Sequence, residues 1–355
     1  MRRIDTVCSY DEYYGMGRHP RRTLLIALIA VLALLVPAFP AMSVAAPADP
    51  VAASAQVEPA VARIDTVIDY QNAIGAGAGI VVDPGGVVLT NFHVVTGADQ
   101  ITATVGGQSF PANLVGYDRR HDIAVVQLAG AAGLPTAPIG DSGQLAPGEL
   151  VVGLGNAQGT GSPLTREVGP ITGFGRTVHA KDELTGSSDE LTGLIEFAAP
   201  VRAGDSGGPV VNSAGQVVGL TTAATLNYRM GPAGQGFAIP INDALAVAGQ
   251  IRSGAASDSV HIGPPTLLGV GVSNADQFGR GPGVIIRDVL RGGAAEQAGL
   301  VSGDVLIDID GATLDTPTAL TYVLDQHYPG DVVGLTWVDS FGQQRTGKAT
   351  LQAGH

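Results

Sequence analysis

The ten residues Val201–Val210, with the sequence VRAGDSGGPV, decide how this chain is interpreted. They place Ser206 in a glycine-rich turn between two mainly apolar runs, Leu194–Phe197 before it and Val210–Val211 after it. Glycines on both sides let the backbone bend sharply, so the serine hydroxyl can stand exposed beside outward-pointing N–H groups. Acyl transfer requires this combination of a nucleophile and amide donors. Glycine-rich turns also occur in ordinary loops, so Ser206 needs partners before it predicts a catalyst.

Two residues upstream are suited to activate this serine. His93 follows the apolar run Val87–Leu89, and Asp122 immediately precedes the β-branched run Ile123–Leu128. A hydroxyl is a poor nucleophile at neutral pH, so a neutral imidazole must take its proton and a carboxylate must hold that imidazole in the correct tautomer. The order His, Asp, Ser is one of the three known linear orders of such a triad.

Each of these residues also has an ordinary structural interpretation. Alone, His93 could be a core histidine, Asp122 a cap or turn acid, and Ser206 a turn serine. His121 competes with Asp122, but a strand period of two places it on the opposite face, where we expect a solvated neighbour. The three residues in order, each beside its own apolar segment, favour a catalytic triad.

At these positions the chain resembles the trypsin-like serine proteases and, among them, the HtrA (DegP-like) family, especially its exported mycobacterial members. The resemblance extends over about residues 57–352, and in the protease part its ordered segments are Gly75–Ile80, Thr90–Val95, His121–Val126, Gly204–Val210 and Gly236–Pro240. It implies that His93 acts as general base and then general acid, that Asp122 orients it, and that Ser206 attacks the scissile carbonyl. The backbone N–H groups of Gly204 and Ser206 would form the oxyanion hole.

One residue departs from the HtrA pattern, which usually has Asn before the serine. This chain has Asp205 there. In digestive trypsin-like enzymes an Asp at this place pairs with an N-terminus released by zymogen cleavage, but nothing upstream resembles that activation site. We therefore expect Asp205 to accept hydrogen bonds from the local backbone.

The resemblance also locates a substrate pocket. Its base should lie near Pro200 and Val201, where no acid is present to pair with Lys or Arg of a substrate. A second wall should come from small, uncharged side chains, those of Thr222, Ala223 and Ala224. An apolar pocket discriminates by size, so we predict cleavage after small or medium aliphatic residues such as Ala, Val or Leu.

The composition favours a folded, exported protein that carries no cofactor. The 355 residues suffice for two or three domains, and the net charge of −13 argues against nucleic acid or anionic lipid as the main partner. The only cysteine, Cys8, lies in the N-terminal segment, so the mature chain would have no disulfide. A Cys/His zinc site is equally excluded, and no metal or other cofactor is expected.

The N-terminal segment, residues 1–46, has the pattern of an export signal. Arg18, Arg21 and Arg22 precede the apolar run Leu24–Val36, and small residues at Val44–Ala46 offer a cleavage site. The run is short for a spanning helix, although its apolar continuation to Met42 leaves an uncleaved membrane anchor open. Secretion or a place in the cell envelope or periplasm is predicted. The stretch before Met16 is acidic and Tyr-rich, which is unusual for an export signal, so we hypothesise that translation starts at Met16.

Short β-branched runs separated by turn residues extend from Val61 to Ile251. This spacing predicts a mainly β architecture, an antiparallel barrel or sandwich. The resemblance makes residues 61–251 a trypsin-like domain of two packed six-stranded barrels, with His93 and Asp122 in the first and Ser206 in the second. Residues 47–60, rich in Ala and Pro, are expected to be a flexible lead-in.

Two further motifs are tempting. Gly75–Gly79 looks like a dinucleotide-binding loop, but a strand pattern follows where a helix would be needed, so nucleotide binding is rejected. The acidic repeat Asp182–Gly186 and Asp189–Gly193 could bind calcium through paired carboxylates, but a solvated acidic loop is the favoured interpretation.

A joint at residues 252–264 leads into a different pattern. Residues 265–352 resemble a small α+β PDZ domain of the kind linked to bacterial proteases, most specifically at Ala298–Val305. Such a module would bind C-terminal peptides by adding their strand to an open sheet edge. The groove would be formed by Leu268, Gly269, Val270, Leu320 and Leu324, although these apolar residues could equally be core positions.

Three functions remain open from the sequence. The leading one is an exported serine endopeptidase that acts on unfolded or extracytoplasmic proteins. The others are a chaperone or holdase with weak cleavage, and a PDZ adaptor on a silent protease fold. The family resemblance also implies a homotrimer, although residues 47–60 lack an obvious aromatic cluster for trimer contacts.

Overall fold

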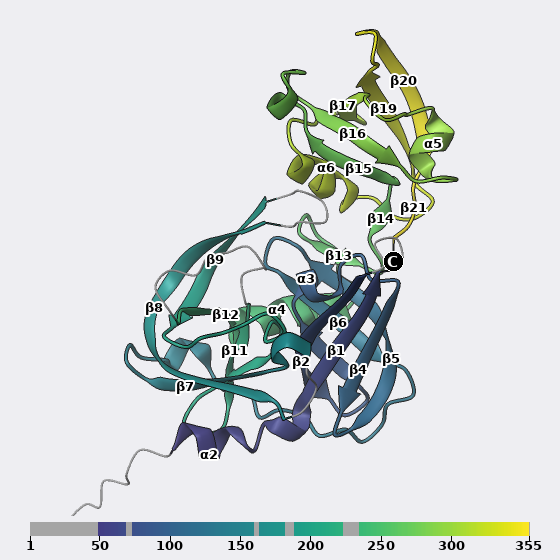
Figure 1. Cartoon of the computed structure of the whole chain (residues 1–355). Coiled ribbons are helices and arrows are strands. Elements are labelled where there is room, and N and C mark those ends of the chain that lie inside the picture. Colours follow the sequence, from purple (N-terminus) through teal and green to yellow (C-terminus); the bar gives the residue numbers. More distant parts are fainter. Residues whose placement is uncertain (1–48, 69–72, 160–162, 182–187, 223–233, 355) are drawn as a thin grey trace, which may run out of the picture. The chain divides into compact units, whose positions relative to one another are not determined.

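The computed structural model describes residues 49–68, 73–159, 163–181, 188–222 and 234–354 (Figure 1). The chain divides into two units, Met1–Ala46 and Pro47–His355, and all of the described residues lie in the second. The predicted export signal with Cys8, and the whole first acidic repeat Asp182–Gly186, therefore lie outside the described residues. No helix within the described ranges is both long and apolar enough to cross a bilayer.

The first half of the peptidase region is an antiparallel sheet of seven strands, in the order β13-β5-β4-β1-β2-β3-β6, in which β6 also pairs with β5. Its strands are rich in β-branched residues whose side chains fill one core, as the buried run in β6 shows. The strands are β1 Val61–Ile68, β2 Ala73–Asp83, β3 Val87–Thr90, β4 Gln100–Val105, β5 Gln108–Asp118, β6 Ile123–Leu128 and β13 Val260–Ile262.

The second half forms a closed barrel of six strands, in the order β10-β11-β12-β9-β8-β7. Its interior holds a separate apolar cluster that includes Phe197, Val210 and Ala238. The strands are β7 Leu150–Gly155, β8 Thr165–Lys181, β9 Ser188–Phe197, β10 Pro209–Val211, β11 Val217–Thr221 and β12 Gly236–Pro240. The predicted mainly β architecture is thus confirmed, and the described residues form one closed six-stranded barrel where two packed barrels were expected.

The first sheet has one strand more than the expected six, because part of the predicted linker belongs to it. After helix α4 (Ile241–Arg252), β13 pairs antiparallel with β5, with Val260 opposite Asp118 and Ile262 opposite Gly116. Val260 is 2% exposed and joins the apolar core of the peptidase region. Burial of this side chain and the ladder hydrogen bonds give the linker a fixed structure.

The lead-in, predicted to be flexible, is also structured. Residues Pro50–Ser54 form the short helix α2, whose N-terminus is capped by the Asp49 carboxylate, which accepts from Val51 N at 3.0 Å. A 3-10 turn, Glu58–Ala60, follows, and Val57 is fully buried in the core. Ala- and Pro-rich composition does not report which side chains find an apolar surface to cover, as Val57 does here.

The C-terminal part is an α+β domain with its own apolar core. Its five-strand order is β15-β16-β17-β19-β20, with β18 beside β17 and a separate pair β14–β21. Helix α6 lies beside the edge strand β15 (Figure 1). The elements are β14 Thr266–Leu267, β15 Val270–Asn274, β16 Val284–Val289, α5 Ala294–Ala298, β17 Val305–Ile309, β18 Ala312–Thr313, α6 Pro317–Leu324, β19 Val332–Val338, β20 Gln344–Thr350 and β21 Gln352–Ala353.

Candidate active site

The imidazole of His93 is held against the carboxylate of Asp122. Strand β3 ends at Thr90, and the single-turn helix α3 (Phe92–Val95) follows and carries His93. His93 Nδ1 lies 2.8 Å from Asp122 Oδ2, while the backbone N–H of His93 donates to Asp122 Oδ1 at 3.0 Å. With Nδ1 engaged by the carboxylate, the predicted role of His93 as a base would use Nε2.

Asp122 occupies the last position of the turn between β5 and β6, in an uncommon backbone conformation. Its φ of 55° is left-handed, which a non-glycine residue adopts only when its surroundings hold it there. Asn91 supplies one restraint, because its amide Nδ2 donates to the Asp122 carbonyl oxygen at 2.9 Å. The side chain is buried, so its carboxylate is presented to His93 in a fixed orientation.

A third donor reaches this carboxylate from the other half of the peptidase region. The hydroxyl of Thr222, directly after β11, donates to Asp122 Oδ2 at 3.1 Å, and Thr222 is 2% exposed. Sequence reasoning named Thr222 as a wall of the substrate pocket and missed this contact. No pattern near Thr222 signals it, since its partner lies 100 residues away in the sequence.

Ser206 lies in the turn that leads into β10, and this turn is bonded to both halves of the peptidase region. Its carbonyl oxygen accepts from Ala78 N of β2 at 2.8 Å, and Gly207 N donates to the Thr221 carbonyl of β11 at 2.8 Å. A side chain at Gly207 would collide with the Ala78 carbonyl and the Thr90 hydroxyl, and Gly207 has a φ of 81°. This turn, called the nucleophile turn because Ser206 is the predicted nucleophile, therefore packs on β2 and on the end of β3, the strand that leads to His93.

Glycines of β2 make this junction possible. A Cβ at Gly77 would lie 2.5 Å from the Val94 side chain and 3.3 Å from the Ser206 carbonyl oxygen. Gly75–Gly79 thus belongs to strand β2. Val94, which follows His93, and the turn of Ser206 both pack closely against this strand at Gly77. This explains the glycine repeat without a nucleotide.

The predicted oxyanion residue Gly204 is in a conformation that suits glycine, with a φ of 96°. Its carbonyl oxygen accepts from Asn156 N at 3.1 Å, which fixes the orientation of the peptide between Gly204 and Asp205. Asp205 N donates to the Arg202 carbonyl at 3.0 Å and closes the turn. That the N–H groups of Gly204 and Ser206 donate hydrogen bonds to an oxyanion stays a prediction.

Asp205 ties the nucleophile turn to the start of β8. Its carboxylate accepts from Thr165 Oγ1 at 2.5 Å and from Arg202 N at 2.9 Å, and its side chain is buried. Burial raises the pKa of Asp205, and the hydrogen bonds from Thr165 and Arg202 N oppose this rise in part. The expected local backbone bond is present, and the Thr165 hydroxyl adds a partner that the sequence did not reveal.

The other pocket residues are placed less fully. Val201 is 7% exposed and packs in the barrel cluster with Phe197, and a Cβ at Gly236 would lie 2.6 Å from its side chain. Ala223 and Ala224 lie outside the described residues. The pocket formed by Val201, Thr222 and these alanines stays a prediction.

His121 is engaged by a carboxylate other than Asp122. Its Nδ1 lies 2.7 Å from Oδ2 of the buried Asp118, which also accepts from Ser259 Oγ at 2.8 Å. The hydrogen bond to Asp118 raises the pKa of His121, although partial burial opposes it. With more than half of its side chain exposed, His121 lines an open hollow of about 610 Å³ together with Arg120 and Glu190.

The predicted peptide groove of the C-terminal domain has an open sheet edge. Strand β15 pairs with β16 on one side only, within the described residues, and Gly269 precedes it with a φ of 80°. Leu268 and Leu320 are buried in the domain core, whereas Val270 and Leu324 are partly exposed. Peptide binding at this edge stays a prediction.

Among the described residues, no group of three or more His, Cys, Asp or Glu side chains is placed to hold a metal ion. The site consists of the His93–Asp122 pair, the buried turn that carries Ser206, and hydrogen-bond donors from both halves of a mainly β fold. Together these features are those of a trypsin-like peptidase domain, and the α+β domain that follows has the open sheet edge expected of a PDZ domain.

Comparison with known proteins agrees with this class. The family model described as trypsin-like peptidase domain matches residues 77–220, and the PDZ domain model matches residues 266–338. The serine protease PepD of Mycobacterium tuberculosis is 32% identical over 315 residues, covering 84% of this chain and 65% of that protein. The chain therefore contains a trypsin-like peptidase domain and a PDZ domain, and it is similar to the HtrA-type (DegP-like) serine proteases.

A second curated relative is also named as a serine protease. A Halomonas elongata protein named "Probable periplasmic serine endoprotease DegP-like" is 33% identical, covering 73% of this chain and 52% of its own length. The chain thus spans between about half and two thirds of the length of these relatives. A solved structure, the HtrA-type protease AlgW with a tripeptide, is 29% identical, covers 86% of this chain and 97% of that chain, and has a TM-score of 0.49.

Proposed function

We propose that this protein is a serine endopeptidase that works through an acyl-enzyme. The observation that carries the proposal is the His93–Asp122 pair, in which both carboxylate oxygens accept hydrogen bonds and Nδ1 of the imidazole is engaged at 2.8 Å. A carboxylate held in this way orients the imidazole and stabilises the positive charge that the ring carries after it accepts a proton. The relatives, which are named as serine proteases, support the same activity.

In the proposed reaction Ser206 Oγ attacks the scissile carbonyl carbon while its proton passes to His93 Nε2. The carbonyl oxygen becomes an oxyanion that the N–H groups of Gly204 and Ser206 stabilise. The imidazolium then donates its proton to the leaving amine, the C–N bond breaks, and an acyl-enzyme remains. Water, deprotonated by His93, releases the acid product and restores Ser206.

The substrates proposed are unfolded or extracytoplasmic polypeptides, cleaved after small or medium aliphatic residues. An uncharged residue at Val201 supports this preference, since no acid is present there to attract Lys or Arg. An exported location, with the N-terminal segment either removed or retained as an anchor, is supported by the arginines and apolar run of residues 18–36 and by the periplasmic naming of relatives. The PDZ domain would take up C-terminal peptides at β15, and a homotrimer is the assembly proposed from the family.

The decisive test is casein cleavage by the purified protein beside the Ser206→Ala variant. Cleavage by the native protein and none by the variant would establish Ser206 as the nucleophile. A native protein that neither cleaves casein nor reacts with a serine-directed fluorophosphonate would overturn the proposal. Cleavage sites in a peptide library test specificity separately, and preferred cleavage after Arg would contradict the aliphatic pocket.

A further inference from the structure

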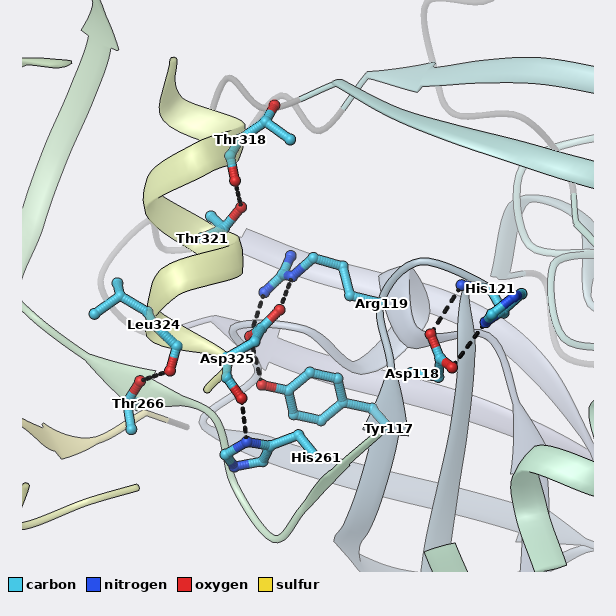
Figure 2. A network of polar contacts seen from close by, with 10 residues as sticks. All are labelled: Tyr117, Asp118, Arg119, His121, His261, Thr266, Thr318, Thr321, Leu324 and Asp325. Atoms are coloured by element: carbon cyan, nitrogen blue, oxygen red, sulfur yellow. Dashed lines mark hydrogen bonds and ion pairs between the residues drawn. The ribbon is translucent and has the colours of Figure 1, made fainter. Parts of the chain in front are cut away.

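A carboxylate of the PDZ domain is bonded to the segment that carries the triad aspartate (Figure 2). Asp325 is the C-terminal cap residue of α6. Its Oδ1 accepts from the Tyr117 hydroxyl at 2.6 Å, and its Oδ2 accepts from Arg119 Nε at 2.5 Å, with Arg119 Nη2 a further 3.3 Å from Oδ1. Both oxygens of Asp325 are thus occupied by donors that stand three and five residues before Asp122.

Helix physics alone does not favour an acid at this position. The C-terminal end of a helix carries partial negative charge, so a carboxylate there is electrostatically unfavourable. The Arg119 guanidinium compensates for it in a two-point ion pair, the geometry that arginine forms best with carboxylates. Asp325 is therefore suited to its contact with the peptidase region and unsuited to α6 by itself.

A stack of rings runs beside this ion pair and reaches the residue next to the catalytic base. Neighbouring ring centroids are 4.0, 5.0 and 4.6 Å apart along the series Phe92, Tyr117, His261 and Tyr328. The Arg119 guanidinium lies 4.8 Å from the centroid of the Phe92 ring. Because Phe92 and His93 are consecutive in α3, the group that binds Asp325 also packs against the element that carries the base.

The contact is desolvated, which makes its geometry sensitive to change. The side chains of Arg119 and Asp325 are 10% and 16% exposed. Burial, together with the Asp325 carboxylate, raises the pKa of Tyr117, so its hydroxyl stays a donor. The main chain of Asp325 is held as well, because its carbonyl oxygen lies 2.9 Å from His261 Nδ1. Removing one partner would leave buried polar groups unpaired.

We propose that Asp325 is a positioning residue for the active site: it fixes Tyr117 and Arg119, and through them the turn that presents Asp122 to His93. The inference rests on the proposed serine-protease function. Asp122 holds a strained φ of 55°, so its orientation depends on restraints at the start of its turn as well as on Asn91 at its end.

The test is the Asp325→Asn variant of the full chain, with Asp288→Asn as matched control. The amide is isosteric, but its NH2 group would face either Tyr117 or Arg119, which are both donors. Asp288 is exposed in β16 of the same domain. We expect the turnover number of Asp325→Asn on casein-derived peptide to fall about tenfold with KM within about twofold, because small misplacements of catalytic groups are costly. Asp288→Asn should match the native protein.

A spectroscopic readout separates this inference from the function on which it rests. The proton shared by His93 Nδ1 and Asp122 gives a far-downfield proton NMR signal, which does not require any turnover. We expect Asp325→Asn to shift or broaden this signal and to change the titration of His93, while Asp288→Asn leaves both as in the native protein. If the native protein cleaves nothing but this shift occurs, the proposed function fails and the positioning role stands.

A second variant covers the case in which Asp325→Asn folds poorly. Arg119→Lys keeps the charge but loses the two-point geometry, and we expect it to reproduce the effect on turnover and on the His93 proton. In the double variant the two losses should be less than additive, because they remove the same interaction. Native turnover together with an unchanged His93 signal in either folded single variant would overturn the proposal.

Discussion

The hydroxyl of Thr222 donates to Oδ2 of Asp122 at 3.1 Å, the same oxygen that lies 2.8 Å from His93 Nδ1. One carboxylate oxygen therefore receives a donor from each half of the peptidase region. This shared oxygen makes the His–Asp geometry depend on how the two halves pack together.

Replacing Thr222 with Val should lower kcat/KM about tenfold, with little change in fold, because the side chains have similar shape. A hydrogen bond to a charged group contributes about 1.5–3 kcal/mol, and Val removes it while leaving the carboxylate buried. The measurement is kcat/KM on a peptide substrate. Thr222→Ser keeps the hydroxyl and should retain most activity; equal activity of the Val variant would contradict a supporting role for Thr222.

Gly207→Ala should prevent formation of a competent nucleophile turn. The added Cβ would collide with the Ala78 carbonyl and the Thr90 hydroxyl, at a φ of 81°. We expect the free energy of unfolding to fall by at least about 2 kcal/mol. Gly130→Ala is the matched control, since Gly130 has a φ of 73° and open space around it, so it isolates the backbone cost. Comparable urea unfolding curves for the two variants would argue against the packing constraint.

Asp205 should make stability decline as pH rises. Burial raises its native pKa above the unfolded value of about 3.9, so the native state binds more protons than the unfolded state between the two values. Its contribution is therefore most favourable below this window and is lost as pH rises through it. The free energy of unfolding of Asp205→Asn, measured by urea titration from about pH 4 to pH 7, should therefore decline less with rising pH than that of the native protein. Parallel curves for the two proteins would contradict the assignment.

His121 should contribute stability below neutral pH through its bond to Asp118. Its native pKa is raised, chiefly by that hydrogen bond, above an unfolded value of about 6.5. The contribution is complete below the unfolded pKa and is lost as pH rises through the native one. Between about pH 6 and pH 8, the Tm of the native protein should fall more than that of His121→Gln. His179→Gln, a change at an exposed histidine of β8, serves as control, and a native-like pH dependence of Tm in His121→Gln would refute the prediction.

The sequence predicted the triad candidates but not the residues that support them. His93, Asp122 and Ser206 stand in short motifs beside apolar strands, and the structure places His93 against Asp122 and the turn of Ser206 against β2. The choice of Asp122 over His121 as a triad candidate also followed from strand periodicity. Thr222 was named for another role, and Asp325 was not named at all.

The sequence by itself determined the class of fold, the order of the triad candidates and the presence of a PDZ domain. The mainly β class and the triad candidates depend on local turn chemistry and on the apolar period of each strand, which short segments encode, whereas the PDZ domain was inferred from family resemblance. Only the tertiary structure decided that β13 joins the first sheet, that α2 is ordered, and that Asp325 meets Tyr117 across 208 residues. Such contacts depend on how separate elements pack and on which donors burial leaves in need of an acceptor. A short segment does not predict such contacts, because the residues that it contacts lie elsewhere in the chain.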